Sequence, residues 1–234
     1  GLFSSDEFST ATLGVLTAHG EVDWRGQWGK RSHVMTVGAE YVDSKLDDGN
    51  SVTQDTEEGG GVPGLGSSGR GSKTSARIAS LFVEDNIELT EKTILTPGLR
   101  FDHHSKTGNN WSPSLNVSHY LDNGITLKAG VARAYKAPNL YQLNPDYLLY
   151  SRGAGCWGAG GPCYLQGNAN LKAETSINKE LGIEYANDTL LAGLTVFHNA
   201  YRNKVDAGLS PVGSAVGGRG SNIFQWTNVP RAEV

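Results

Sequence analysis

Apolar and polar residues alternate through most of this sequence, and a period of two confines the chain to β-strands with one apolar and one polar face. The segment 125–131, for example, places Ile125, Leu127 and Val131 on one face and Lys128 on the other. The same pattern marks segments at 12–28, 33–46, 74–88, 95–102, 111–121, 177–185 and 189–203, and a last strand-like run lies at 222–234. We therefore expect an all-β chain with about nine strands.

The connections between these segments alternate between short and long. Short connections carry turn residues, as in Asp122-Asn123-Gly124, which suits a tight hairpin. Longer, polar and mostly Gly-rich connections are expected at 47–73, 105–110, 137–174 and 204–221. This alternation places the tight turns at one end of an up-and-down antiparallel meander and the large loops at the other. Short periplasmic turns and long extracellular loops are typical of a transmembrane β-barrel of the outer membrane.

Composition agrees with a barrel that has a polar interior. Only 38% of the residues are hydrophobic, and there is no run of eighteen apolar residues that could form a transmembrane helix. A net charge of −4 argues against a nucleic-acid partner, because nucleic-acid binding requires a basic surface. A soluble antiparallel sandwich would also alternate, but its strands are usually about 5 or 6 residues long. Pro97 and Pro113 fall inside strand patterns and require a strand end or a local bulge.

Several long stretches resemble the barrel of TonB-dependent outer-membrane receptors. They include Ser80–Asn86, Leu95–His104, Asn109–Asn116 and Arg133–Gln142. Residues 144–180 narrow the resemblance and are closely similar to the ferric-enterobactin receptor family. The similarity is strong over 80–234 and vague over 1–73.

This resemblance implies a 22-stranded barrel in the bacterial outer membrane, crossing it many times, with a plug inside the lumen. Such a receptor binds a ferric catecholate siderophore of the enterobactin type and imports it with energy transmitted by TonB. We interpret residues 1–234 as part of the barrel domain and expect the N-terminal plug and the C-terminal strands to lie outside this chain. Other expected partners are outer-membrane lipid and lipopolysaccharide. Neither enzymatic activity, nor an intrinsic cofactor, nor a metal site of the protein's own is expected.

The loop 137–174 is the candidate ligand-binding site that the resemblance implies. Ferric enterobactin is a large aromatic trianion, so it requires a cation and flat aromatic partners. Arg152 offers a delocalised cation that can stack and donate several hydrogen bonds, and it lies near Tyr150, Trp157 and Tyr164. The family commonly has Tyr where this sequence has Trp157, a change that keeps stacking and loses a phenolic hydrogen bond.

Two cysteines in the same loop, Cys156 and Cys163, predict a disulfide, because the outer surface is reached through an oxidising periplasm. The bridge would hold Trp157 and Tyr164 in fixed positions. A metal pair is the poorer alternative, since no further Cys or suitably spaced His accompanies the two.

Residues outside this cluster have simpler interpretations. Trp111, Tyr135 and Tyr141 are expected to anchor the barrel at the membrane interface. Arg70, Lys73 and Arg219 are expected to add positive charge to the mouth of the barrel, or else to be solvated loop charges or lipopolysaccharide contacts.

Three alternatives to a ferric-enterobactin receptor remain open at the level of sequence. The first is a receptor for a salmochelin-like or other catecholate siderophore. A passive porin is the second, although it would not need an aromatic loop closed by a disulfide. The third is a secreted, glycan-binding β-sandwich, which would not partition into detergent.

Overall fold

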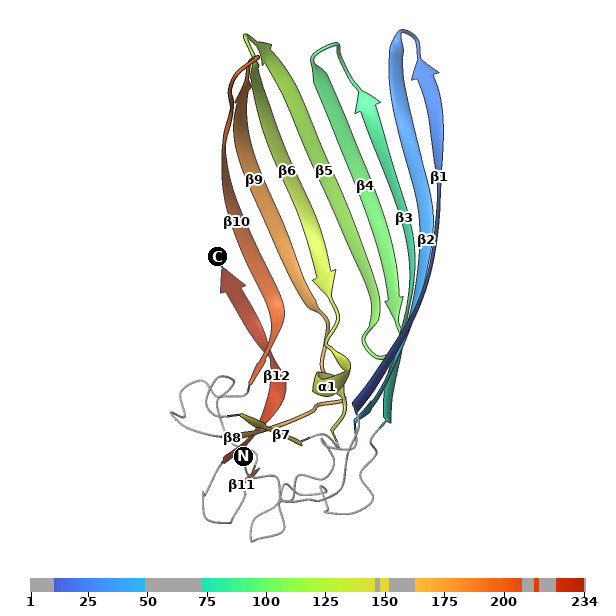
Figure 1. The fold of residues 1–234 in the computed structure, drawn as a ribbon, viewed down its shortest axis with the longest axis vertical. Coiled ribbons are helices and arrows are strands. Elements are labelled where there is room, and N and C mark those ends of the chain that lie inside the picture. Colours follow the sequence, from blue (N-terminus) through green and yellow to red (C-terminus); the bar gives the residue numbers. More distant parts are fainter. Residues whose placement is uncertain are drawn as a thin grey trace.

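The chain folds into one curved sheet of long strands (Figure 1). The computed structural model describes residues 11–48, 73–145, 148–151, 163–207, 213–214 and 222–233. The long strands are β1 (Ala11–Trp28), β2 (Arg31–Asp48), β3 (Lys73–Glu88), β4 (Thr93–His104), β5 (Gly108–Asp122), β6 (Ile125–Lys136), β9 (Glu174–Ala186), β10 (Leu191–Ala207) and β12 (Asn222–Glu233). Four short elements also occur, namely α1 (Leu140–Leu143), β7 (Leu148–Ser151), β8 (Cys163–Gln166) and β11 (Gly213–Ser214).

The order of the strands in the sheet follows their order in the chain, as the meander predicts. The path runs from β1 to β6, then through β9, β10 and β12, and ends on β8 and β7, while β11 pairs with β12. Neighbours are antiparallel except for β12 and β8, which are parallel. The predicted all-β, antiparallel barrel segment is therefore confirmed. In the part of the chain that the structure describes, no helix is long and apolar enough to cross a membrane.

The two ends of the sheet differ in their connections. The connections β1–β2, β3–β4, β5–β6 and β9–β10 lie together at the upper end in Figure 1. The strand ends that lead into the long connections, including the C-terminal ends of β2 and β6, lie at the lower end. We call these the turn end and the loop end.

One connection was predicted wrongly as a longer loop. Residues 105–110 contain only a tight turn between β4 and β5, and β5 already begins at Gly108. His104 Nδ1 accepts hydrogen bonds from the backbone N–H groups of Lys106 and Thr107, at 3.0 and 3.1 Å. Gly108 has a φ of 86°, which a residue without Cβ adopts readily. A histidine side chain and a glycine therefore close this turn.

Neighbouring turns at the turn end are tied by charge. Lys92 Nζ, in the β3–β4 turn, donates to both carboxylate oxygens of Asp122, at 2.9 and 2.8 Å, in the β5–β6 turn. These hydrogen bonds to the Asp122 carboxylate raise the pKa of Lys92 above its ordinary value. Because both side chains are exposed, this pair orders the turn end without adding much stability.

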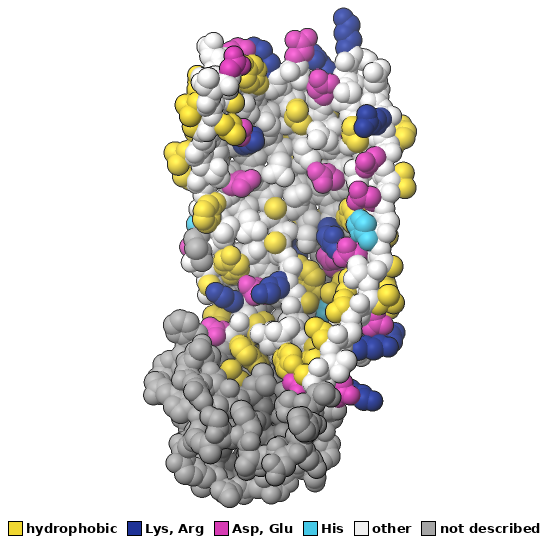
Figure 2. Space-filling model, viewed as in Figure 1, with side chains coloured by type: hydrophobic (Ala, Val, Ile, Leu, Met, Phe, Trp, Pro, Cys, Tyr) yellow, Lys and Arg dark blue, Asp and Glu magenta, His cyan; other side chains and the backbone are white. Residues whose placement is uncertain are grey.

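The register sorts the strand residues into an apolar and a polar face. Val22, Val37, Val83 and Leu99 are successive cross-strand partners and form one apolar row. Apolar residues of such rows are exposed, as Leu181 is at 63%, which is expected of a surface that faces lipid. Figure 2 shows charged side chains spread over the face in view, with hydrophobic side chains projecting at both margins.

The polar face carries a connected group of charges across β2, β3 and β4, which we call the lumenal network. Arg100 lies 3.0 Å from Asp102 and 3.6 Å from Glu40, and its guanidinium stands over the Phe82 ring. Ser80 Oγ donates to Asp102 at 2.5 Å. Asp102 is only 3% exposed, so the hydrogen bonds from Arg100 and Ser80 compensate for the cost of burying a carboxylate.

The position of the Phe82 ring depends on a glycine. Gly38 is the cross-strand partner of Phe82, and a Cβ built on Gly38 would overlap the ring. The ring therefore lies flat over the β2 backbone, where it also stacks on His19 at 5.8 Å between centroids.

Replacing Gly38 should destabilise the barrel. In the full-length protein, we expect Gly38→Val to displace the Phe82 ring and lower the free energy of unfolding by about 1–3 kcal/mol. Thermal unfolding monitored by the loss of β-sheet circular dichroism would measure the change. Gly20→Val is the matched control, since nothing lies within 4 Å of a Cβ at Gly20. Equal unfolding temperatures for the two variants would contradict this account of Gly38.

Each of the two strand prolines lies where pairing with one neighbouring strand is missing. Pro97 lies within β4 and Pro113 within β5. The β3–β4 register omits Pro97 and resumes beyond it without a shift, and the β5–β6 register begins at Ser114, next to Pro113. Each proline therefore lies where the ladder on one side is interrupted.

Candidate ligand-binding site at the loop end

The short helix α1 folds over the polar side of the sheet at the loop end. Leu140 is buried against Leu46 of β2 and Ala76 of β3, and Tyr141 packs on this cluster. The prediction that Tyr141 anchors the barrel at the membrane interface is therefore wrong, because the helix turns this residue toward the barrel. Trp111, another of the three predicted anchors, is exposed on the apolar side, as a residue at the membrane interface would be.

Three side chains hold the helix α1 in place. The Asn139 side chain accepts a hydrogen bond from the Gln142 backbone at 2.8 Å, and the Gln142 side chain accepts one from the Asn139 backbone at 3.0 Å. This reciprocal capping box satisfies donors that a four-residue helix would otherwise leave unpaired. Asn144, at the C-terminal end, donates to Thr74 Oγ1 of β3 at 2.6 Å. The helix is therefore attached directly to the barrel wall.

The segment 165–173 packs against α1 and is joined to α1 and to the residues that follow it by hydrogen bonds. The backbone N–H of Asn168 donates to the carbonyl of Gln142 at 2.7 Å, and Gln166 Nε2 donates to the carbonyl of Pro145 at 3.0 Å. Leu165, Leu171 and Ala173 are buried in this layer.

The strand β12 supports the same segment from the other side. Asn228 Oδ1 accepts from the Lys172 backbone at 2.8 Å, while Asn228 Nδ2 donates to the carbonyls of Lys172 and Asn203 at 2.9 and 2.7 Å. Asn168 Nδ2 also donates to the carbonyl of Trp226, at 3.0 Å. We call α1, residues 165–173 and the β12 residues that bond them the loop scaffold.

The loop scaffold holds a small hairpin formed by β7 and β8. Tyr150 pairs with Tyr164, and Ser151 pairs with Cys163, in the antiparallel register. On its other side β8 pairs in parallel with β12. Two of the four residues predicted to contact the ligand, Tyr150 and Tyr164, are therefore direct backbone partners, although 14 positions separate them in the sequence.

The other predicted site residues lie outside the described residues. These are Arg152, Trp157 and Cys156, together with the loop cations Arg70 and Arg219. The disulfide between Cys156 and Cys163 remains a prediction for the same reason. Lys73 is the first residue of β3, is exposed, and faces Asp47 in the register, which places its charge at the loop end.

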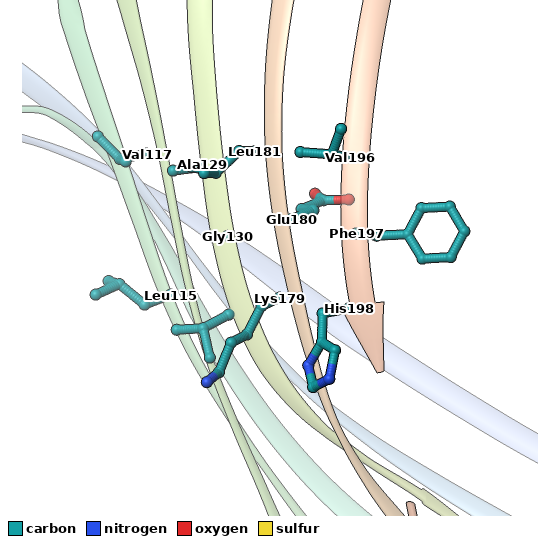
Figure 3. A pocket seen from close by; sticks show the side chains of 11 residues that line it. Leu115, Val117, Ala129, Gly130, Lys179, Glu180, Leu181, Val196, Phe197 and His198 are labelled. Atoms are coloured by element: carbon teal, nitrogen blue, oxygen red, sulfur yellow. The ribbon is translucent and has the colours of Figure 1, made fainter. Parts of the chain in front are cut away.

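The outer surface carries grooves of a different kind. Leu115, Val117, Ala129, Leu181 and Val196 line an apolar groove across β5, β6, β9 and β10. In Figure 3, Val117 and Val196 project to one side of the sheet and Phe197 to the other. An apolar groove on the apolar face is suited to lipid acyl chains, so we do not place the candidate ligand site there.

Comparisons with known proteins agree with this architecture. The family model described as "TonB dependent receptor-like, beta-barrel" matches residues 2–234. The chain belongs to the TonB-dependent receptor β-barrel family. Its place is therefore the bacterial outer membrane, which its strands cross repeatedly.

Individual relatives are receptors for iron complexes. The ferric enterobactin receptor of Pseudomonas aeruginosa is 61% identical over all of this chain and 32% of its own length. For the ferrienterobactin receptor of Escherichia coli K12, identity is 54% over 87% of this chain and 27% of its own length. The chain thus spans about a third of the length of the curated relatives it matches.

Solved structures share the same fold. A mutant ferric enterobactin receptor from Pseudomonas aeruginosa, crystallised in complex with enterobactin, superposes with a TM-score of 0.83 at 62% identity. The superposition covers 96% of this chain and 32% of that one. A siderophore receptor from Acinetobacter baumannii superposes with a TM-score of 0.80 at 42% identity, covering 99% of this chain and 34% of that one.

The loop scaffold leaves no room for a side chain at Gly167. A Cβ built on Gly167 would overlap the carbonyl oxygen of Asn144, a backbone atom that cannot swing aside. In the full-length protein, we therefore expect Gly167→Ala to separate residues 165–173 from α1 and to weaken about tenfold the binding of ferric enterobactin, the ligand that the name of the Pseudomonas aeruginosa relative gives. Equilibrium quenching of tryptophan fluorescence by the ligand would measure the affinity.

Gly193→Ala is the matched control for this variant, because a Cβ at Gly193 meets only the Ile183 carbonyl at an ordinary 3.6 Å. We expect the control to bind ferric enterobactin as the wild type does. Wild-type affinity in Gly167→Ala would show that the loop scaffold does not position the ligand site.

Proposed function

We propose that this chain is the ligand-capturing part of a receptor that takes up ferric catecholate siderophores of the enterobactin type. The pairing of Tyr150 with Tyr164 on a scaffold fixed to the barrel wall carries the proposal. It supports a site in which residues from both ends of a long loop meet beside Arg152. The names of the relatives, which are ferric enterobactin receptors, agree with this ligand class.

In this proposal, the loop residues of the receptor recognise the ligand by its charge and its rings. Arg152 donates hydrogen bonds to the anionic catecholate oxygens, and the aromatic side chains stack on the catecholate rings. Trp157 provides stacking alone. The iron is cargo, already enclosed by the siderophore, so the protein needs no metal ligand, intrinsic cofactor or catalytic group. Release into the periplasm depends on TonB acting through the plug.

The disulfide belongs to this proposal. A bridge between Cys156 and Cys163 would close a short loop and hold Trp157 and Tyr164 close to the β7–β8 hairpin. Since Cys163 pairs with Ser151, the bridge would also fix the position next to Arg152.

The ligand assignment is tested by substituting Tyr150 and Arg152, which come first in the sequence among the four predicted ligand-binding residues. In the full-length receptor, Tyr150→Ala combined with Arg152→Ala should weaken ferric-enterobactin binding at least about tenfold, because a cation and a stacking partner are lost. The matched control is Tyr120→Ala combined with Arg25→Ala, which removes the same residue types far from the loop end. A screen of ferric catecholates, ferric hydroxamates and haem would define the ligand class. Unchanged affinity in the double variant would refute the site.

The disulfide is tested by thiol labelling. We expect the unreduced full-length receptor to resist maleimide at Cys156 and Cys163, and to react at both after reduction. Labelling of either cysteine before reduction would contradict the predicted bridge.

A further inference from the structure

The barrel wall is split between β5 and β6 at the loop end. The ladder between these strands ends at Ser114 and Ala132, and the described residues beyond them form no further β5–β6 pair. Both strands nevertheless continue. Residues Gly108–Pro113 of β5 stay paired with β4, and residues Arg133–Lys136 of β6 stay paired with β9. We call these two facing stretches the wall split, and its four β6 residues extend over about 13 Å.

The wall split begins where the lipid-facing surface ends. Leu115 and Val131 are the last paired apolar residues on the outer face of these two strands, and both are exposed. Unpaired backbone groups are not tolerated in the hydrocarbon region, because no water is available to them there. The split therefore lies on the loop-end side of that region, where β5 and β6 can separate without exposing their backbones to lipid.

Along the split, β5 has the properties of an edge strand. The carbonyl of Trp111 faces β6, and it accepts a hydrogen bond from the Arg133 side chain instead of a backbone N–H group. Pro113 lies two positions further on and has no N–H group to leave unpaired on the same side. Proline and charged side chains are the usual protection of an exposed sheet edge. The split is therefore a built feature of the wall.

The side chain of Arg133 reaches through the wall. Arg133 is the cross-strand partner of Ile177, which places it on the outer face of the sheet. Its Nη1 donates to Asn110 Oδ1 at 2.7 Å and to the carbonyl of Trp111. Asn110 is the partner of the buried Asp102, so its side chain belongs to the lumenal face. An outward residue can bond a lumenal side chain only where no ladder separates the two strands.

The β6 side of the split leads directly into the loop scaffold. β6 ends at Lys136, and α1 begins four positions later at Leu140. The position of the β6 end relative to β5 therefore affects where α1 and the residues bonded to it lie. At this level of the wall, the bonds from Arg133 take the place of the missing ladder.

We propose that the wall split is a hinge and that Arg133 is the latch that holds it closed, so that Arg133 positions the ligand-binding loop without touching the ligand. Both acceptors are neutral, so the latch depends on the N–H donors of the guanidinium. When the latch is lost, the β6 end moves against β5, and the ligand must order the loop as it binds, which lowers its affinity. The role in positioning rests on the proposed function, whereas the hinge is a property of the wall alone.

The hinge is tested by hydrogen–deuterium exchange of the ligand-free, full-length receptor, measured by mass spectrometry. We expect Arg133→Gln to speed amide exchange in Gly108–Pro113 at least about fivefold, because the bonds that close the split are lost. Residues Ser114–His119 are paired on both sides and should exchange as in the wild type. The matched control is Lys128→Gln, which removes a β6 cation that bonds Glu184 where the ladder is intact.

Two results of the exchange experiment would overturn the latch. One is wild-type exchange of Gly108–Pro113 in Arg133→Gln. The other is faster exchange along the whole of β5, which would show a general loss of stability. Because this experiment uses no ligand, its failure is distinguishable from failure of the siderophore site, which the Tyr150 and Arg152 double variant tests.

The role in positioning is tested with ferric enterobactin. We expect Arg133→Gln to bind it about fivefold more weakly than the wild type and the Lys128→Gln control do. Since the ligand binds the closed state more tightly, saturating ferric enterobactin should also return the exchange of Gly108–Pro113 in Arg133→Gln toward the wild-type rate. Wild-type affinity in Arg133→Gln, or exchange that the bound ligand leaves unchanged, would overturn the positioning of the loop by Arg133.

Discussion

The pairing of backbone hydrogen-bond groups between long strands is the constraint on which the rest of this structure depends. Inside a membrane no water is available for an unpaired N–H or C=O group, so a strand can cross only if both of its neighbours pair with it. The registers from β1 to β6 and on through β9 and β10 meet this requirement over most of their lengths, with interruptions on one side at Pro97 and Pro113. Because pairing consumes the backbone groups, only side chains remain to distinguish one face of the sheet from the other.

That division explains how much of the fold the sequence could predict. Period-two alternation in segments such as 125–131 predicts a strand, its two faces and its neighbours, because alternation is a local property that lipid on one side enforces. The tight turn after His104 was missed, since its closure depends on a histidine side chain accepting two backbone hydrogen bonds. No periodic pattern encodes such a contact.

The site was predicted less completely, for the same physical reason. The resemblance indicated the loop and its aromatic residues, and the structure brings Tyr150 and Tyr164 together as backbone partners. The sequence did not reveal α1, although the spacing of Asn139 and Gln142 is a capping signal that could have suggested it. The bonds from Asn144 to Thr74, and from Asn228 to Lys172, join segments about 55 to 70 positions apart, and nothing local predicts them.

The same alternation also connects the lipid-facing surface to the height of the loop scaffold. Odd positions of β9 face outward and change from apolar at Ile183 and Leu181 to polar at Lys179 and Thr175, so the strand itself marks where the hydrocarbon region ends. On the opposite face, the strands continue only a short distance before α1 and residues 165–173 cover them. The apolar rows therefore fix the depth of the barrel in the membrane. Because β8 pairs with β12 and β12 pairs with β10, that depth also fixes the height at which the β7–β8 hairpin lies.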